Sequence, residues 1–393
     1  MAPALALLLA VSAGGLDDLR LELGSQAEAR SRTLSLEGEA AETRLSLEAR
    51  PRVAVVAEGP ALRVSAAYAP WVRAWELDER PELGHELHLG VAAATHRWRI
   101  DAGATGRRGR MDPLDDLGRS LSSESATPLP TLEPQPFAAA EARAAASVLL
   151  GGRTSLRTAA AFGVTGGTDA AARLLLPVSR SVSASAAVER RVTWNDTVTL
   201  GAGAVASRTD PGSELAVLAA DATWRRQLSR TLEAWAGAGA ALQRADPVET
   251  RAGRPTLAPT GVLGLAHASA RGRSASLTGR AFTTLDPYAG VAYRAVEARA
   301  TLGVRPWRDI GLQASLVGLT SLPDPDVALG GLDLVAGWAS GPDLTLEAGA
   351  SGRWQRDETA GRPSFVEVHT FVGVRFAAGA RRSAGRMPAG AAP

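Results

Sequence analysis

Apolar and polar residues alternate along most of this chain. In the segment FVEVHTFVGVRF (365–376), one face carries valines and ends on Phe376, whereas the other face carries Glu367, His369 and Arg375. A period of two is the geometry of a β-strand, because successive side chains of a strand point to opposite sides of the sheet. The same arrangement recurs from about residue 30 to residue 376, so the sequence predicts an all-β protein.

The alternation predicts about 18 strands, with 16 to 18 allowed because the pattern is weak in the first strand and around residues 166–180. Bounded by their turn residues, the predicted strands are 30–37, 43–57, 61–75, 86–96, 97–107, 137–150, 154–165, 181–193, 197–208, 214–226, 230–243, 256–270, 273–285, 291–305, 308–320, 329–339, 343–355 and 364–376.

Tight and long connections alternate between these strands. Tight turns include GGR (151–153) and RGR (271–273), and longer ones include ADPVETRAGRP (245–255). Transmembrane barrels have short turns at one rim and longer loops at the other, whereas a β-sandwich has no reason to sort its loops in this way. The sequence therefore predicts a single transmembrane antiparallel up-and-down β-barrel over residues 30–376.

Two connections differ from the others. Residues 107–136 are rich in Pro and Ser and lack a sustained period, so they are predicted to form a long loop, either on the surface or folded inward as a constriction. Residues 166–180 are predicted to form either an additional strand or a loop packed on the rim.

The two faces of the predicted strands are expected to contact different environments. The apolar face is expected to contact lipid, and the mixed face is expected to line a water-filled lumen, where charges need not be desolvated. The residues predicted to line the pore are Arg44, Arg63, Arg99, Asp101, Glu141, Arg143, Arg157, Glu189, Arg191, Arg280, Glu297, Arg299, Glu347, Arg353, Glu367 and Arg375. Their arginines either favour anionic or sugar-like solutes or form structural ladders with the carboxylates.

Aromatic residues lie near segment ends on the face that is expected to contact lipid. They are Trp98, Tyr68, Trp224, Trp338 and Phe376. Tryptophan and tyrosine favour the interface between lipid and water, so we expect them to form a sparse aromatic girdle.

The ends of the chain are predicted to lie outside the barrel. Residues 1–13 have the apolar stretch and the small residues before a cleavage position that are typical of a signal peptide. The basic residues that usually come before the apolar stretch are missing. An apolar strand or helix is the alternative. An N-terminal segment (14–29) and a periplasmic tail (377–393) flank the predicted barrel.

Composition excludes several classes of protein. Lys and Arg total 43 against 41 Asp and Glu, and every basic residue is Arg, so the high isoelectric point indicates no nucleic-acid partner. The chain has no Cys, which excludes disulfides, thiolate catalysis and cysteine-ligated metals.

Candidate chemistry is sparse. His85 and His88 are three residues apart, which places them on opposite faces of a strand and does not favour a shared metal. No Ser and His pair carries a local signature, and GVTGGTD (163–169) lacks the Lys and the helix of a phosphate-binding loop. The chain is therefore predicted to be neither an enzyme nor a cofactor-binding or metal-binding protein.

These features together resemble bacterial outer-membrane β-barrel proteins over residues 30–376. The resemblance implies that Val372, Val374 and Phe376 form the signal read by the barrel-assembly machinery, although here a tail follows the aromatic residue. More loosely, the number of strands resembles the porin-type barrels that are partners in polysaccharide secretion systems, which implies a periplasmic export partner.

The expected function is a pore in the cell outer membrane for hydrophilic solutes or polymer. The expected partners are membrane lipid, the barrel-assembly machinery and an export partner. The alternatives are a structural or adhesive barrel with a blocked lumen, and a soluble exported β-protein.

Overall fold

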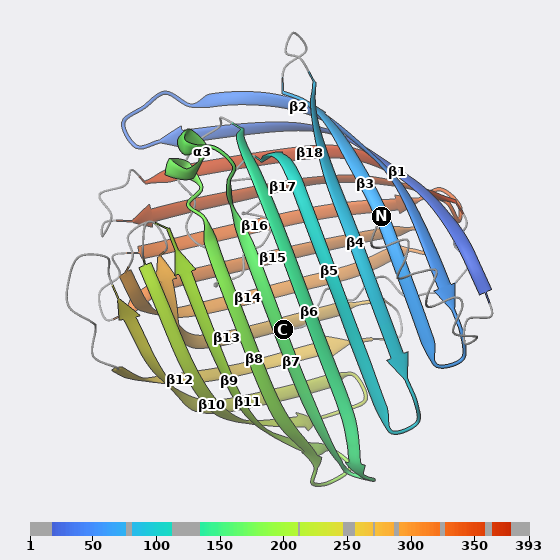
Figure 1. Cartoon of the computed structure of the whole chain (residues 1–393), viewed down its shortest axis with the longest axis vertical. Helices are drawn as coiled ribbons and strands as arrows, with labels where there is room; N and C mark the ends of the chain where they lie inside the picture. The colour runs from blue at the N-terminus through green and yellow to red at the C-terminus, as the bar shows by residue number, and fades with distance from the viewer. Residues whose placement is uncertain are drawn as a thin grey trace.

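The computed structural model is one antiparallel sheet of 18 strands that closes into a barrel (Figure 1). It describes residues 18–75, 81–111, 134–210, 213–246, 256–269, 272–286, 291–322, 327–357 and 364–378. The strands are β1 (Asp18–Leu36), β2 (Glu42–Glu58), β3 (Leu62–Ala74), β4 (Glu82–Ala94), β5 (Trp98–Met111), β6 (Gln135–Gly151), β7 (Thr154–Gly167), β8 (Ser179–Arg191), β9 (Asp196–Thr209), β10 (Ser213–Gln227), β11 (Leu232–Asp246), β12 (Thr256–Ala268), β13 (Ser274–Asp286), β14 (Val291–Trp307), β15 (Ile310–Leu322), β16 (Val327–Ala339), β17 (Leu344–Asp357) and β18 (Phe365–Ala378). The predicted fold class is confirmed.

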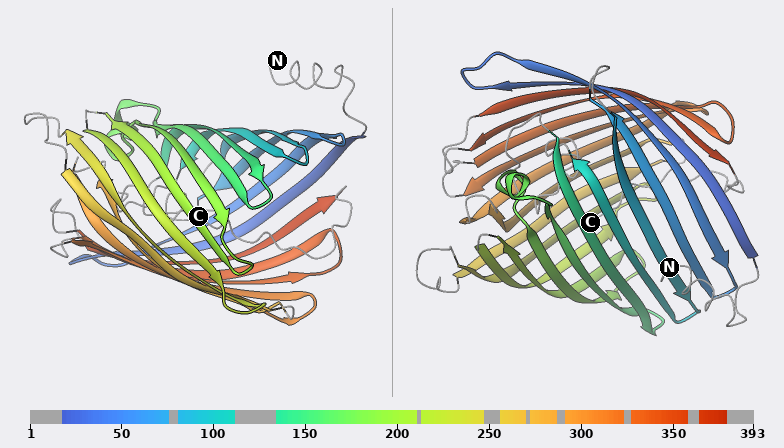
Figure 2. Two further views of the ribbon diagram at one scale, coloured as in Figure 1. Left: turned by 90° about the horizontal axis from the view of Figure 1, so that it is seen from below. Right: turned by 45° about the horizontal axis from the view of Figure 1, so that its top comes forward.

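The first and last strands close the barrel. β1 pairs with β18 from Leu23 opposite Ala378 to Leu36 opposite Phe365, and it pairs with β2 on its other side. Every other strand pairs with its neighbours in sequence, so the topology is up-and-down. The strands run obliquely around one continuous wall (Figure 2).

The first strand is longer than the sequence pattern predicted. We expected it to begin at residue 30, after an N-terminal segment 14–29, but β1 begins at Asp18. The alternation of Leu19, Leu21 and Leu23 with polar residues was present in the sequence, and the run of small and polar residues from Gly24 concealed its continuation. The predicted signal peptide 1–13 lies outside the described residues, as does the predicted tail beyond Ala378.

The two unusual connections differ from the prediction in different ways: the first is shorter than predicted, and the second contains a short helix. β5 continues to Met111 and β6 begins at Gln135, so strands occupy both ends of the predicted loop 107–136, and residues 112–133 lie outside the described part. Between β7 and β8, the helix α3 (Ala170–Leu175) is capped by Asp169, whose carboxylate accepts a hydrogen bond of 2.8 Å from the Ala172 amide. This connection packs on β6 and β7, in agreement with the rim alternative.

The connections form two rims. The turns between β4 and β5 (95–97), β6 and β7 (152–153) and β14 and β15 (308–309) lie on one rim, which we call the short-turn rim. The strand ends that precede and follow 112–134, 168–178 and 247–255 lie on the other, which we call the long-loop rim and which carries α3. Within the described residues, no helix is long and apolar enough to cross a membrane.

The outer face is free of charge over the middle of every strand. Register places Leu200, Leu218, Leu263, Leu316 and Leu334 on this face, and each side chain is exposed. Among the side chains that the structure describes, charged residues occupy outward positions only near the strand ends. This uninterrupted apolar band is what a hydrocarbon layer requires.

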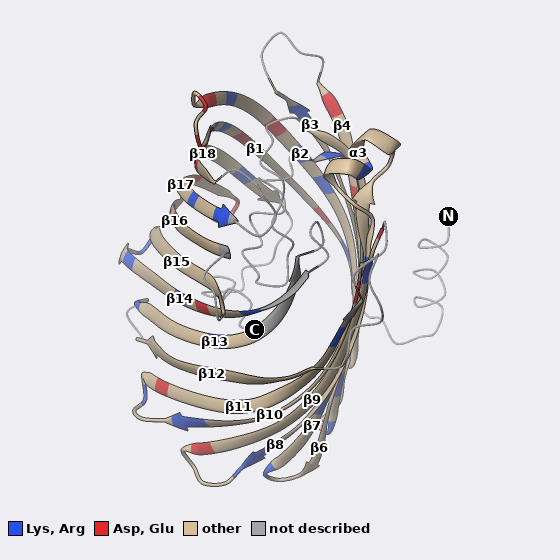
Figure 3. Cartoon of the chain, turned by 90° about the vertical axis from the view of Figure 1, so that its left-hand side faces the viewer, with Lys and Arg blue, Asp and Glu red and all other residues tan. Residues whose placement is uncertain are grey.

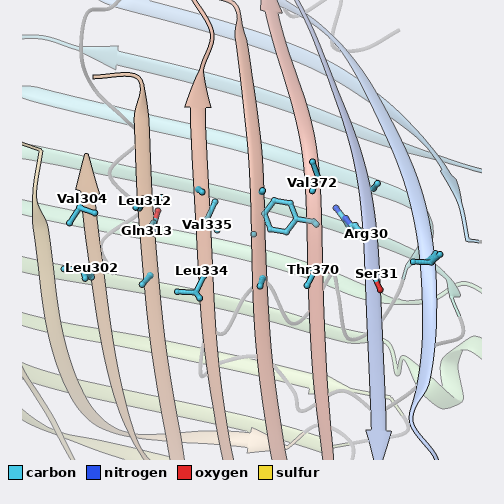
Figure 4. A pocket seen from close by; sticks show the side chains of 18 residues that line it. Arg30, Ser31, Leu302, Val304, Leu312, Gln313, Leu334, Val335, Thr370 and Val372 are labelled. Carbon is cyan, nitrogen blue, oxygen red and sulfur yellow. The ribbon is translucent and has the colours of Figure 1, made fainter. Parts of the chain in front are cut away.

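A shallow apolar groove of about 820 Å³ crosses the outer face from β14 to β2 (Figure 4). Its larger side chains, among them Leu302, Leu312 and Leu334, project from outward positions, and alanines such as Ala336 and Ala348 form its floor. The groove arises because small residues on neighbouring strands lie side by side in the register.

The aromatic girdle is concentrated at the short-turn rim. Trp98, Trp224, Trp338 and Phe376 lie on the outer face near this rim, as predicted, and Trp307 joins them. Tyr68, by contrast, lies in the middle of β3, where its hydroxyl is 2.6 Å from His85 Nδ1. These outward aromatic residues therefore gather near one end of the barrel.

Adjacent residues in the middle of β8 test the assignment of the two faces. Ala186 faces outward between Thr158 and Ala202, whereas Ser185 faces inward between Ala159 and Gly203. We expect Ala186→Arg to lower the free energy of unfolding in vesicles by about 2–4 kcal/mol, because the charge lies in the apolar band. Ser185→Arg is the matched control and is expected to change it little. Urea unfolding followed by tryptophan fluorescence measures both variants, and equal losses would contradict the assignment.

Candidate functional site

The mixed face of the sheet is the interior of the barrel. The guanidinium of Arg50, on β2, lies 3.9 Å from the carboxylate of Glu86, on β4, and 5.7 Å from the centroid of the Trp71 ring, on the intervening β3. Side chains separated by a whole strand approach one another only on the concave side of a curved sheet. Residues that lie opposite each other in neighbouring strands share a face, so the register extends the assignment of the inner face around all 18 strands.

Register places all the residues predicted to line the pore on this inner face. They are Arg44, Arg63, Arg99, Asp101, Glu141, Arg143, Arg157, Glu189, Arg191, Arg280, Glu297, Arg299, Glu347, Arg353, Glu367 and Arg375. The prediction of the inner face depends on strict alternation within each strand. A single unrecognised bulge would have moved every later residue of that strand to the other face. Contact with a transported solute stays a prediction.

Glu48 is the centre of a buried cluster on β1, β2 and β3. It accepts a hydrogen bond of 2.5 Å from Arg73 Nε and a second from Arg50 Nε, and it lies 4.0 Å from Arg30. The side chains of Glu48, Arg30 and Arg73 are only 2–4% exposed. Removing an ion from water costs several kcal/mol, so these groups are stable in this position only as partners.

Glu86 extends this cluster to β4 and β5. Its carboxylate lies 2.8 Å from His88 Nε2 and 3.6 Å from Arg107 Nε, in addition to its contact with Arg50. Arg50 and Arg107 both lie over the ring of Trp71, with distances of 5.7 and 5.9 Å to the centroid. The result is a ladder of alternating charge that links five consecutive strands.

A second buried pair crosses the seam where the barrel closes. Glu367, on β18, accepts a hydrogen bond from Arg32 Nε, on β1, and lies 3.7 Å from Arg353, on β17. On β13 and β14, Arg280 donates two hydrogen bonds of 3.2 and 3.3 Å to Glu297, and Arg299 lies 3.7 Å from the same carboxylate. Among the predicted residues, Glu367, Arg353, Arg280 and Glu297 therefore take part in these interstrand ion pairs.

An apolar cluster occupies the inner wall near the long-loop rim. Trp71, Phe137 and Leu176 pack together and are almost completely buried, and the rings of Trp71 and Phe137 lie 6.4 Å apart. Gly84 and Gly109 make this arrangement possible, because a Cβ at either position would lie within 3 Å of the Trp71 ring. Leu176 follows α3, so the connection between β7 and β8 reaches the interior.

The opposite part of the inner wall has a different character. From β7 to β11 the inward positions carry mostly Ser, Thr, Ala and Gly, and the inward side chains of Ser181 and Ser185 are exposed. The ion pair of Arg157 and Glu189, 3.0 Å apart, is also solvated, with side chains 61% and 31% exposed. Short side chains therefore line this arc, whereas longer, paired side chains line the wall from β17 to β5.

Part of the buried ladder was not predicted from the sequence. Glu28, Arg30 and Arg32 of β1 and Glu86 of β4 were not among the predicted lining residues. The alternation EARSR (28–32) carried the signal for the first three, and the predicted strand start at residue 30 cut through it.

The described residues include no group of His, Asp and Glu side chains that is arranged to hold a metal ion. Register confirms that His85 and His88 lie on opposite faces of β4, outward and inward respectively. His369 Nδ1 lies 3.5 Å from Ser351 Oγ on the inner wall, at the limit of a hydrogen bond.

No family model matches the chain, and no curated protein matches its sequence. Its structure is similar to that of the FrpB iron transporter from Neisseria meningitidis in its apoprotein form, with a TM-score of 0.51, 9% identity, and coverage of 92% of this chain and 82% of that chain. OpdO of Pseudomonas aeruginosa matches with a TM-score of 0.49, 12% identity, and coverage of 93% and 99%. OccK11 (OpdR) of the same organism matches with a TM-score of 0.46, 12% identity, and coverage of 93% and 97%. At such low identity the likeness to FrpB concerns the fold alone, and this chain has the fold of a porin-like outer-membrane β-barrel.

The buried ladder leads to a prediction about stability. Replacing Glu48 by Gln leaves the guanidiniums of Arg50 and Arg73 without their main anionic partner, and we expect a loss of about 3–5 kcal/mol in the free energy of unfolding. Asp101→Asn is the matched control, because its pair with Arg99 (2.7 Å) is exposed and surface pairs contribute little. Urea titration in vesicles compares the two, and an equally small effect would show that the ladder does not stabilise the barrel.

Proposed function

We propose that this chain is a passive pore of the cell outer membrane, which admits hydrophilic solutes. The observation that carries the proposal is the contrast between the two sides of one wall: a charge-free outer band and an inner face with solvated charges and hydroxyls. Barrels of about this number of strands are wide enough to hold an aqueous channel. The proposal requires no bond-making chemistry, and transport depends on the size and charge of the lumen.

The proposed selectivity is weak. Ion pairs between arginines and carboxylates neutralise much of the inner charge, as for Arg157 with Glu189 and Arg225 with Glu233. The slight excess of arginine favours anionic or sugar-like solutes to a small degree.

Polymer export is the narrower form of the proposal. The hydroxyl-lined arc of β7 to β9 supports it, because Ser and Thr both donate and accept hydrogen bonds and so suit a hydrated sugar chain. In that case a periplasmic export partner would bind at the short-turn rim. The role of Val372, Val374 and Phe376 in recognition by the assembly machinery is likewise a proposal, supported by their outward positions on the closing strand β18.

Conductance in planar bilayers tests the pore. We expect the refolded chain to give steady channels with weak ion selectivity, because the open arc provides a continuous wet path. The heat-modifiable mobility of the folded barrel on gels is the control for insertion. A folded, inserted barrel with no steady current would support the alternative of a structural or adhesive protein with a blocked lumen.

A pair of adjacent residues on β8 tests which wall lines the path. Ser183 faces inward between Ala161 and Val205, and Val182 faces outward between Phe162 and Ala206. We expect Ser183→Trp to lower single-channel conductance, because the indole narrows the open arc. Val182→Trp is the matched control and is expected to leave conductance unchanged. Equal conductance in both variants would contradict an open arc at β8.

Oligosaccharides added to one side of the bilayer test the narrower proposal. We expect chains of several sugars to block the current reversibly, and monosaccharide at the same mass concentration to block it much less. Equal responses to both would argue against a polymer path.

A further inference from the structure

Arginines on the outer face gather at the long-loop rim. Among the described side chains, seven exposed arginines occupy outward positions near this end of their strands. Arg110 pairs with Glu82 at 2.7 Å, and we call the other six the arginine belt: Arg108, Arg180, Arg208, Arg244, Arg294 and Arg356. Figure 3, which looks onto the rim that carries α3, shows basic residues at several strand ends. The apolar band begins directly beneath them.

The densest part of the belt lies on β8 to β11. Arg180 and Arg208 lie directly opposite each other in the register, and Arg208 also lies opposite Glu214. Like charges in this position destabilise a sheet. The available carboxylates compensate poorly, because Asp210 lies 3.9 Å from Arg180 and Glu214 lies 3.4 Å from Arg208, with all four side chains about half exposed or more.

A second polar group lies in the belt on β3 to β5. Arg108 lies opposite His85, whose ring stacks on Tyr68 with centroids 6.1 Å apart. No carboxylate occupies an outward position with a described side chain on β3, β4, β5 or β6. The cation therefore faces the membrane interface without an acidic neighbour on this surface.

The short-turn rim is richer in outward tryptophan, although Trp354 is an outward tryptophan near the long-loop rim. The outward arginines of the short-turn rim include Arg190 and Arg226. Its outward positions carry the tryptophans of the girdle, and its outward Arg226 lies 3.8 Å from Asp196, which also accepts a hydrogen bond from Trp224. Tryptophan suits an interface of any headgroup charge, whereas a belt of exposed guanidiniums suits an anionic one. The two rims thus differ in the groups that they present on the outer face.

We propose that the arginine belt binds the phosphate groups of an acylated, phosphorylated glycolipid in the leaflet at the long-loop rim. Guanidiniums bind phosphate with two parallel hydrogen bonds, and one phosphate between Arg180 and Arg208 would remove their repulsion. The acyl chains of the same molecule would lie on the apolar band below, on residues such as Val182 and Leu218. This proposal rests on the proposed membrane location of the barrel.

Binding to detergent-solubilised, refolded full-length chain tests the proposal. The probe is diphosphoryl lipid A, detected by native mass spectrometry, and the other arms are phosphatidylcholine and inorganic phosphate. We expect salt-sensitive binding of the glycolipid, weakened roughly fivefold for each arginine removed, so that Arg180→Gln with Arg208→Gln and Arg244→Gln loses about a hundredfold. Arg190→Gln with Arg226→Gln, on the outer face at the short-turn rim, is the matched control and is expected to bind normally.

Several results would overturn the proposal. Equal binding of phosphatidylcholine would show that the apolar band alone selects the lipid, and equal occupancy by inorganic phosphate would assign the arginines to a free anion. Equal losses at both rims would show a general effect of charge. Arg108→Gln, on a distant strand, provides a separate variant should the triple variant fail to fold, and normal binding by it would also count against the belt.

The failure of this proposal can be told from that of the pore. A wild-type chain without heat-modifiable mobility would overturn the membrane barrel and the belt together. A folded barrel that conducts ions and binds glycolipid equally well with or without the belt arginines would overturn the belt alone.

Discussion

The pairing of β1 with β18 is the constraint on which the rest of the structure depends. A sheet with free edges would expose unpaired amide and carbonyl groups to lipid, at a cost of several kcal/mol for each group. Closure gives every strand two partners and creates an inside and an outside. Glu367 of β18, bonded to Arg32 of β1, places one of the buried ion pairs at this seam.

Closure also allows charge and apolar surface to coexist on one strand. On β2, Leu45 and Leu47 face outward and are exposed, while Glu48, the next residue along the strand, faces inward and is buried among arginines. In a soluble protein these exposed leucines would be a liability, and in the proposed membrane barrel they form the surface that lipid covers. The same alternation of residues therefore suits the strand to lipid on one face and to water on the other.

The inner wall is asymmetric, and its two parts have different roles. From β17 to β5 the arginines and carboxylates are mostly engaged with one another, and the Trp71 cluster adds bulk near the long-loop rim. From β7 to β11 the inward positions carry mostly Ser, Thr, Ala and Gly, so this part of the wall has shorter side chains. We infer that the first arc maintains the shape of the barrel and that the second leaves room for solute.

Local pattern by itself predicted the fold class, a range of 16 to 18 strands and the face of every predicted lining residue, because a period of two can be read without any knowledge of partner strands. The closed sheet fixed the number of strands at 18. Local pattern did not determine where β1 begins, since Gly24, Ser25 and Gln26 weaken the alternation and only pairing with β2 and β18 shows that the strand continues. Nor could it separate the buried Glu48 from the solvated Glu189, which have the same local pattern. That distinction depends on which arginines adjacent strands bring within reach, and only the register of the closed sheet decides it.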